Sequence, residues 1–177
     1  ARAEVAIARD LPLELGTRAP HLRWVQAVGA GIEQMDPAGL AELGIVLTNA
    51  SGVAAASISE FVMGRLLAEW KRFDVFDALQ AQAVWRREDT HLVAGRTLGI
   101  VGLGAIGRAT AKRARAFEME VLATSRRATS NASDPDADRL YPLAELNDML
   151  GHCDAVLASM PSTPDTVHFF DTPRFAA

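Results

Sequence analysis

The sequence predicts an α/β protein with a doubly wound parallel sheet, and three observations support this class. Short apolar runs of strand type alternate with helical stretches from the first residues onward. A buried-strand pattern that ends near residue 101 runs directly into a glycine-rich turn and then into a helix. Further strands follow, separated by a loop and a short helix, as expected for parallel strands joined by crossover connections.

The bulk composition is typical of a globular chain and argues against several classes of protein. The 177 residues are 49% hydrophobic and 23% charged, with a formal net charge of −4. This charge argues against a nucleic-acid partner, and no apolar run approaches the length of a membrane span. The single cysteine, Cys153, rules out an internal disulfide framework and indicates a reducing compartment. We therefore expect a cytoplasmic protein that binds neither nucleic acid nor membrane.

The first part of the chain contains a candidate anion site. Strands are predicted at 4–8, 22–28 and 44–48, with short helices at 12–19 and 36–43. The turn Gly29-Ala30-Gly31 directly follows the second of these strands. Open parallel sheets bind ligands at the carboxyl ends of their strands, and consecutive backbone N–H groups can hold a carboxylate. The alternative is a tight turn without a ligand.

The longest predicted helix covers residues 57–80. Ser57 and Glu60 have the spacing of a capping box, so we expect the helix to begin at Ser57. Apolar residues recur along it at helical spacing: Ile58, Phe61, Val62, Leu66, Leu67, Trp70, Phe73, Val75, Phe76 and Leu79. A stripe this wide is typical of core packing or of a subunit interface. The interface alternative predicts that Phe73, Phe76 or Leu79 is exposed in one chain.

The glycine-rich turn carries the strongest functional signal. Residues 102–107 read Gly-Leu-Gly-Ala-Ile-Gly. Gly102 permits a tight turn, Gly104 lets the backbone approach a pyrophosphate, and Gly107 lets the following helix pack close to the strand. That helix, predicted over 105–117, directs free N–H groups at the anion. Because a strand precedes the motif and a helix follows it, we interpret it as a Rossmann-type dinucleotide site rather than a structural turn.

The rest of this unit predicts the sheet and the choice of cofactor. Strands near 98–102, 120–124, 140–141 and 154–159 should lie in the spatial order 3-2-1-4. We interpret 127–138 as a surface loop and 143–150 as a short helix. The second strand ends in Ser125-Arg126-Arg127, where NAD-binding units carry a carboxylate. Arginine suits a 2′-phosphate, so NADP is predicted in preference to NAD; two solvated arginines are the alternative.

No catalytic group stands out in the sequence. The histidines His21, His91, His152 and His168 are not paired in sequence with a carboxylate, and we interpret them as surface or capping residues. No cluster of His, Cys and Asp has the spacing of a metal site. Cys153 comes just before a strand, where a buried thiol is more typical than a nucleophile. We therefore predict no metal and assign no catalytic residue within this chain.

Together these motifs resemble those of the D-isomer-specific 2-hydroxyacid dehydrogenases. The matching segments follow the family order over about residues 20–172 and are 22–26, 29–33, 57–60, 85, 95–108, 154–156 and 161–166. The resemblance implies that the loop Val28, Gly29, Ala30 and Gly31 receives the carboxylate of a 2-oxo acid, with Ala30 also beside the cofactor. It implies that the backbone of Ala105 and Ile106 meets the pyrophosphate. Ser125 takes the position of the ribose-binding Asp, and Met160, Pro161 and Thr166 form the loop under the adenosine.

The resemblance also implies a domain organisation and an activity. Residues 1–52 would be part of a flavodoxin-like substrate domain, and 53–177 an incomplete NAD(P)-binding domain that opens with the homodimerisation helix 57–80. The family's catalytic Arg, Glu and His would follow residue 177, so the chain reads as truncated at both ends. The implied activity is NAD(P)-dependent oxidoreduction of a small D-2-hydroxy or 2-oxo acid, as in glyoxylate and hydroxypyruvate reductases. A non-enzymatic dinucleotide-binding sensor or interaction protein is the alternative.

Overall fold

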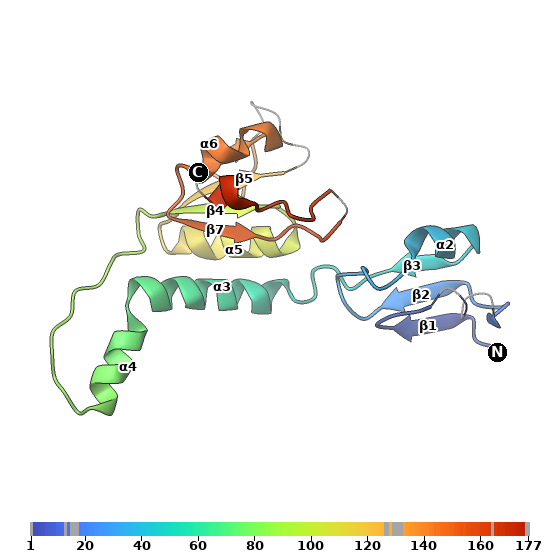
Figure 1. The fold of residues 1–177 in the computed structure, drawn as a ribbon, viewed down its shortest axis with the longest axis horizontal. Coiled ribbons are helices and arrows are strands. Elements are labelled where there is room, and N and C mark those ends of the chain that lie inside the picture. Colours follow the sequence, from blue (N-terminus) through green and yellow to red (C-terminus); the bar gives the residue numbers. More distant parts are fainter. Residues whose placement is uncertain are drawn as a thin grey trace. The chain divides into compact units, whose positions relative to one another are not determined.

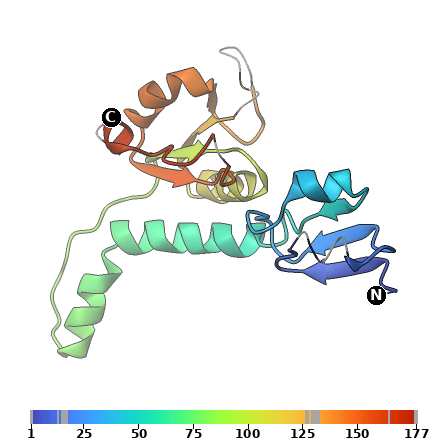
Figure 2. The ribbon, with the colours of Figure 1, turned by 45° about the vertical axis from the view of Figure 1, so that its right-hand side comes forward.

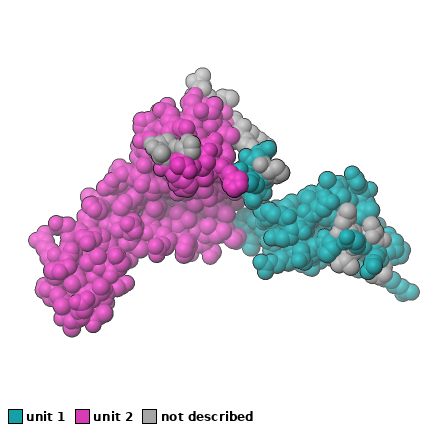
Figure 3. All heavy atoms as spheres, in the orientation of Figure 1, with its two compact units in different colours: residues 1–53, 161–167 teal, residues 54–160, 168–177 magenta. Residues whose placement is uncertain are grey.

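The computed structural model describes residues 2–12, 14, 18–125, 128, 133–163 and 165–175 (Figure 1). The chain divides into two compact units, coloured separately in Figure 3. Unit 1 comprises residues 1–53 and 161–167, and unit 2 comprises residues 54–160 and 168–177. Each unit has its own parallel sheet. Within the described residues, no helix is both long enough and apolar enough to cross a bilayer.

Unit 1 contains a parallel sheet with one helix after its second strand. The strands are β1 (Val5–Ala8), β2 (Trp24–Ala27) and β3 (Val46–Thr48), in that spatial order, and the helix is α2 (Pro37–Glu42). Asp36 caps α2 by accepting a bond from the Gly39 amide, and Pro37 occupies the first turn. The predicted strands and the helix at 36–43 are confirmed. The helix predicted at 12–19 falls largely outside the described residues.

Unit 2 contains the sheet that positions the glycine-rich turn. Its parallel strands are β4 (Thr97–Val101), β5 (Glu120–Thr124), β6 (Arg139–Tyr141) and β7 (Ala155–Ala158). They lie in the order β6-β5-β4-β7, which confirms the predicted order 3-2-1-4. Every residue of β4 is buried, as expected for a central strand covered on both faces.

Helices cover both faces of this second sheet (Figure 2). On one face lies α5 (Ala105–Ala116), against which α3 (Ala55–Trp70) packs. The other face carries the 3-10 turn η1 (Leu143–Glu145) and α6 (Leu146–Leu150), so the helix predicted at 143–150 begins with a tighter turn. The last helix of the chain is the short α7 (Thr172–Phe175). Separate apolar clusters fill the two faces, around Ile100 on the α5 side and around Met149 on the α6 side.

The single helix predicted over 57–80 is wrong, because the structure divides it into α3 and α4 (Phe73–Ala81). Arg72, between them, adopts a left-handed conformation with φ of 53°. The carbonyl of Trp70 accepts a hydrogen bond from the His91 amide of the returning chain, at 2.9 Å. Asp74 in the first turn of α4 favours a new helix start there, because an acidic group complements the helix dipole.

The predicted cap at Ser57 is also wrong. The helix begins at Ala55 after Ala54, which makes no side-chain cap bond. Two alanines, the best helix formers, extend α3 upstream of Ser57 and place that residue inside the first turn. Glu60, the expected partner in the capping box, instead pairs with Arg113 of α5 at 3.1 Å.

The apolar stripe of this region is partly core and partly surface. On α3, Met63 is buried and Leu66, Leu67 and Trp70 pack against the core around Ile100. On α4, Phe73 and Phe76 keep 48% and 38% of their surface exposed. Leu79, the third candidate for exposure, is buried where the chain turns back, and its carbonyl accepts a bond from the Val84 amide. The exposure of Phe73 and Phe76 fits the interface alternative.

Candidate functional site

The turn after β4 has the geometry that its glycines predict. Gly102 adopts φ of 101°, in the left-handed region that side chains disfavour. A Cβ at this position would also lie 3.0 Å from the Met160 nitrogen and 3.1 Å from the Ser159 carbonyl carbon. The Gly102 amide donates to the carbonyl of Thr124 at the end of β5. The prediction that Gly102 permits a tight turn beside the sheet is confirmed.

Free backbone donors follow the turn. Gly104 precedes α5, and its carbonyl accepts the first helical bond from the Arg108 amide at 2.9 Å. The amides of Ala105, Ile106 and Gly107 therefore find no acceptor in the described part of the chain. A Cβ placed on Gly104 would meet no atom within 4 Å, so the space in front of the turn is open. Open space beside unpaired amides at a helix N-terminus fits a phosphate group.

Gly107 allows the close contact between α5 and β4. A Cβ on Gly107 would lie 2.5 Å from the Gly102 carbonyl oxygen and 3.0 Å from Ile100. The prediction that this glycine lets the helix pack against the strand is confirmed. The hydroxyl of Ser159 donates to the same Gly102 oxygen at 2.7 Å. Sequence reasoning missed Ser159, whose one signal was its place at the carboxyl end of β7.

Ser125 is the residue that the sequence predicts to select the cofactor. Ser125 is half-buried and directly follows β5. Arg126 and Arg127, the predicted phosphate contacts, lie outside the described residues. Beside Ser125, the Thr124 hydroxyl is buried and has no hydrogen-bond partner in the described part of the chain. The carboxyl edge of the sheet thus holds an unpaired buried polar group next to Ser125 in the sequence, and the role of Ser125 in selecting the cofactor stays a prediction.

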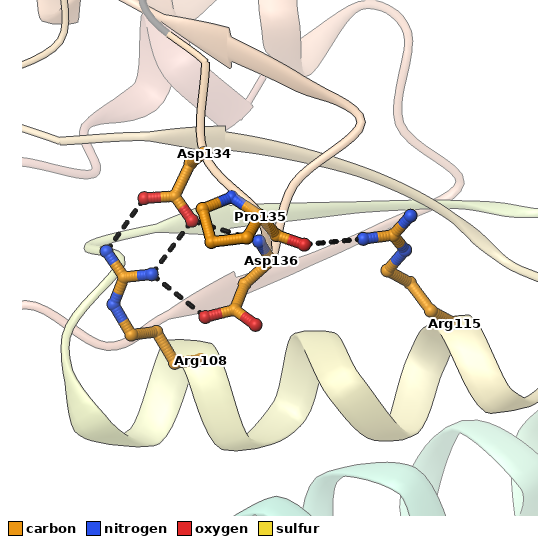
Figure 4. Close-up of polar contacts among 5 residues, drawn as sticks. All are labelled: Arg108, Arg115, Asp134, Pro135 and Asp136. Atoms are coloured by element: carbon orange, nitrogen blue, oxygen red, sulfur yellow. Dashed lines mark hydrogen bonds and ion pairs between the residues drawn. The ribbon is translucent and has the colours of Figure 1, made fainter.

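An ion cluster joins α5 to the connection between β5 and β6 (Figure 4). Arg108 donates two bonds of 2.8 Å to the two carboxylate oxygens of Asp134 and one of 2.9 Å to Asp136. The guanidinium holds the pKa of Asp134 below its ordinary value. Of the predicted surface loop 127–138, residues 127 and 129–132 lie outside the described residues, and 133–138 form an irregular turn at the surface from which only Ala137 reaches the core. The partners stand 26 residues apart, so no local pattern indicated the pair.

The loop after β7 is closed by its own hydrogen bonds. Met160 packs against the apolar cluster around Met149. The Thr166 hydroxyl accepts a bond of 2.7 Å from the Thr163 amide and donates one of 2.8 Å to the Pro161 carbonyl. The role of these residues toward adenosine stays a prediction, and Thr166 has a structural role that the sequence did not indicate.

The Gly29–Gly31 turn lines a hollow at the carboxyl end of β2. The carbonyl of Gly29 accepts from the Ala50 amide, and that of Ala30 accepts from the side chain of Asn49. The amides of Gly29, Ala30 and Gly31 have no acceptor among the described residues. The hollow, of about 370 Å³, is lined by Arg9, Val28, Gly29, Gly31, Glu33 and Gln34. Unpaired amides in a hollow fit a carboxylate better than a closed structural turn.

The sequence analysis did not identify two charged side chains that line this hollow, Arg9 and Glu33. Arg9 follows β1, whose carboxyl end lies at the same edge of the sheet as that of β2. Glu33 stands over Gly31, with a carboxylate oxygen 3.0 Å from the point that a Cβ would occupy. An arriving carboxylate would meet one attractive and one repulsive charge here.

The structure gives no catalytic role to Cys153 or to His152. The Cys153 thiol donates to the Met149 carbonyl, and burial raises its pKa to about 11. A thiol with a raised pKa is a poor nucleophile, in agreement with the interpretation of Cys153 as structural. His152, in the turn after α6, lies 3.8 Å from Asp148, and because both side chains are exposed such a pair contributes little.

Unit 2 is a Rossmann-type dinucleotide-binding unit, as three features show: the order of its strands, the left-handed glycine turn and the unpaired amides at the start of α5. Residues 63–177 match the profile of the NAD binding domain of the D-isomer specific 2-hydroxyacid dehydrogenases. This match covers more than half of the sequence, and the chain belongs to that family. The family resemblance predicted from the motifs is thereby confirmed.

Several relatives agree with this assignment. A glyoxylate reductase of Thermococcus gammatolerans is 32% identical over 164 residues, which are 88% of this chain and 48% of that enzyme. A family member from Aeromonas salmonicida has a TM-score of 0.80 at 30% identity, over 98% of this chain and 55% of its own. An NADPH-dependent glyoxylate/hydroxypyruvate reductase of Sinorhizobium meliloti, in complex with NADP and sulfate, has a TM-score of 0.78 at 28% identity, over 98% and 54%. The chain thus spans about half the length of these relatives.

Proposed function

We propose that this chain is the dinucleotide-binding part, together with a segment of the substrate domain, of an NAD(P)-dependent reductase. Its substrates would be small 2-oxo acids and the corresponding D-2-hydroxy acids, of the glyoxylate or hydroxypyruvate type. One observation carries the proposal: the glycine turn presents the unpaired amides of Ala105, Ile106 and Gly107 to open space. The relatives named above support the substrate class.

The cofactor role of each residue follows from the chemistry of the groups it offers. The amides of Ala105 and Ile106 would hold the pyrophosphate, close to the backbone of Gly102, Gly104 and Gly107. The ribose and its 2′-phosphate would meet Ser125, Arg126 and Arg127. The loop with Met160, Pro161 and Thr166 would lie under the adenosine. When bound, the dinucleotide supplies or accepts the hydride that is exchanged with C2 of the substrate.

The substrate carboxylate would be received by the loop from Val28 to Gly31. Its free amides are neutral donors, which suit a carboxylate without a large desolvation cost. Arg9 in the same hollow adds a positive charge. We assign no proton transfer to His152 or Cys153, since neither has the required setting. We place the division between the two domains at residues 52 and 53.

Two further proposals concern the whole protein. The first is a homodimer through the region of α3 and α4. The exposed aromatic rings of Phe61, Phe73 and Phe76 support it, because monomers rarely expose such a group of large apolar side chains. The second is a cytoplasmic location, for which the free thiol of Cys153 is the support.

Titration with NADPH and NADH tests the proposed function. We expect saturable binding, followed by nicotinamide fluorescence, that is lost in Gly104→Val because its side chain fills the space in front of the turn. Gly64→Val is the matched control: the position is equally open but lies in α3, away from the turn. No saturable binding of either dinucleotide would contradict the proposal. Binding without glyoxylate-dependent oxidation of NADPH by the complete protein would favour the sensor alternative.

A further inference from the structure

The hollow at the carboxyl end of β2 contains an acidic side chain to which the proposed carboxylate contact gives no role. Glu33 lines the hollow together with Arg9 and the loop that carries the free amides. Among the residues that the structure describes, neither charged side chain has a hydrogen bond or an ion pair with another residue. A cation and an anion are therefore both available to a ligand in the same hollow.

The two charged residues flank opposite ends of the amide loop. The Val28 amide donates to the Ala8 carbonyl at 3.0 Å, so Arg9, the residue after Ala8, begins beside the start of the loop. Glu33 stands over Gly31 at the end of the loop, with a carboxylate oxygen 3.0 Å from the point that a Cβ would occupy. The loop therefore runs from a positively charged end to a negatively charged end.

The loop is held so that its amides remain free. The Gly29 carbonyl accepts from the Ala50 amide at 3.0 Å, and the Ala30 carbonyl accepts from the Asn49 side chain at 2.8 Å. In a trans peptide the carbonyl and the N–H of one unit point in opposite directions. The amides of Ala30 and Gly31 are therefore directed away from residues 49 and 50, and neither of these residues lines the hollow.

The charges give a bound acid a preferred direction. A carboxylate on the free amides is attracted by the Arg9 guanidinium and repelled by the Glu33 carboxylate, so it lies toward Arg9. The remaining carbons of the acid then face Glu33. A carboxylate in that position accepts a hydrogen bond from a hydroxyl group, and hydrogen bonds to charged groups are among the stronger ones. It repels a second acidic group and finds no partner on a methyl group.

We propose that Glu33 is a specificity-determining residue that accepts a hydrogen bond from a hydroxyl group on C3 of the substrate. The hollow therefore takes 3-hydroxy-2-oxo acids, of the hydroxypyruvate type, in preference to acids with a methyl group or a second acidic group in that place. This inference rests on the proposed function, since it concerns the substrate of the same site. It gives Glu33 no part in the transfer of the hydride or of a proton.

The test is the ratio of kcat/KM for hydroxypyruvate to kcat/KM for pyruvate, which lacks only the C3 hydroxyl, in variants of the complete protein. In Glu33→Ala we expect this ratio to fall about tenfold, which corresponds to about 1.4 kcal/mol, because the acceptor is lost. Glu33→Gln keeps an acceptor oxygen without the charge, and its ratio should stay within about threefold of the wild type. In the same variant, kcat/KM for oxaloacetate, which carries a second carboxylate, should rise because the repulsion is gone.

Two further variants serve as comparisons. Glu42→Ala is the matched control, because Glu42 is an exposed acid of α2 in the same unit that does not line the hollow. Its ratio should equal that of the wild type. Arg9→Met should lower kcat/KM for hydroxypyruvate and pyruvate by the same factor, since both acids present the same carboxylate to Arg9.

Several outcomes would overturn the inference. An unchanged ratio in Glu33→Ala, including an equal loss for both acids, would show that Glu33 does not read the C3 hydroxyl. A ratio that falls in Arg9→Met and not in Glu33→Ala would show that the acid lies in the opposite direction. If Glu33→Ala does not fold, unchanged activity toward oxaloacetate in Glu33→Gln overturns the inference. A wild-type protein that reduces glyoxylate but not hydroxypyruvate contradicts this inference alone, whereas one that reduces neither acid contradicts the proposed function.

Discussion

The hydroxyl of Ser159 donates a 2.7 Å hydrogen bond to the carbonyl oxygen of Gly102, a residue that comes 57 positions earlier in the chain. The same oxygen accepts the Gly104 amide at 2.9 Å. A Cβ on Gly107 would lie only 2.5 Å from it. Two hydrogen bonds therefore fix the orientation of this carbonyl, and the absence of a side chain at Gly107 leaves room for it. Because the turn that follows directs the free amides of Ala105 and Ile106, Ser159 takes part in setting their direction.

Loss of this hydroxyl should weaken binding without changing the choice of cofactor. In Ser159→Ala we expect the Kd for NADPH and for NADH to rise by the same factor, about two- to tenfold, because a protein hydrogen bond contributes about 0.5–1.5 kcal/mol. Fluorescence titration of both dinucleotides measures this effect. Ser57→Ala, at an exposed position of α3, is the control and should bind as the wild type does. An unchanged Kd in Ser159→Ala would show that the turn holds its conformation without the serine.

The fold of unit 2 could be predicted because its signals are local. A continuous apolar run marks β4, and the glycine spacing after it fixes the turn and the start of α5. The order of the strands follows from this motif, since a doubly wound unit has few arrangements. The same local chemistry placed Ser125 at the end of β5 and the Gly29–Gly31 turn at the end of β2.

The contacts that support the site could not be predicted, because they join distant segments. Arg108 and Asp134 are 26 residues apart, and in the sequence each one alone is typical of a solvent-exposed charged side chain. The break at Arg72 carries no glycine or proline, and the hydrogen bond from His91 to Trp70 occurs only after the chain has returned. Apolar periodicity continues across that break, so it predicted one helix where tertiary contacts produce two.

The two later glycines of the motif should respond differently to alanine. Gly104→Ala should fold with an unchanged Tm, since its Cβ would meet no atom within 4 Å and its φ of −89° suits any residue. Its Kd for dinucleotides should nevertheless rise, because the methyl group stands where the pyrophosphate approaches the backbone. In Gly107→Ala, the Cβ would press on the Gly102 carbonyl, and overpacking of this kind costs about 1–3 kcal/mol of folding stability. Thermal unfolding and titration of both variants separate the two effects, and an equal loss of Tm in both would contradict the assignment.

The aromatic surface of α4 should control assembly. In Phe76→Asp we expect a dimer to dissociate into monomers, because the carboxylate of the new aspartate would have to be buried at the interface. The secondary structure should be unchanged, because Phe76 is partly exposed in one chain. Light scattering after size-exclusion chromatography gives the mass, and circular dichroism reports the fold. Leu43→Asp, at an exposed apolar position in unit 1, is the matched control and should keep the mass of the wild type. A wild-type protein that is monomeric at high concentration would contradict the proposed arm.

Alkylation of Cys153 should depend on pH in a defined direction. The thiolate is the reactive form, and burial raises the pKa of this thiol from 9.0 to about 11. The native protein should therefore resist iodoacetamide at pH 8.5, whereas the unfolded chain reacts. Because the pKa of the thiol is higher in the folded than in the unfolded chain, the protonated thiol contributes fully to the free energy of unfolding below pH 9. This contribution is lost as pH rises toward 11. Mass spectrometry of native and urea-unfolded samples measures the difference, and rapid labelling of the native form would show that the thiol is not protected.

A carboxylate at position 125 should reverse the preferred dinucleotide. Ser125 directly follows β5, where an acidic side chain accepts bonds from the ribose hydroxyls of NAD and repels the 2′-phosphate of NADP. In Ser125→Asp we therefore expect weaker NADPH binding and tighter NADH binding, with a combined change in the Kd ratio of about tenfold or more, since each 1.4 kcal/mol is a factor of ten. Addition of Arg126→Ala should enlarge the change by removing a charge-assisted bond to the phosphate. Ser133→Asp places the same charge at an exposed position near the other end of this connection and should leave the ratio within about threefold of the wild type. A wild-type protein that already binds NADH more tightly than NADPH would show that the serine and arginines do not select the phosphate.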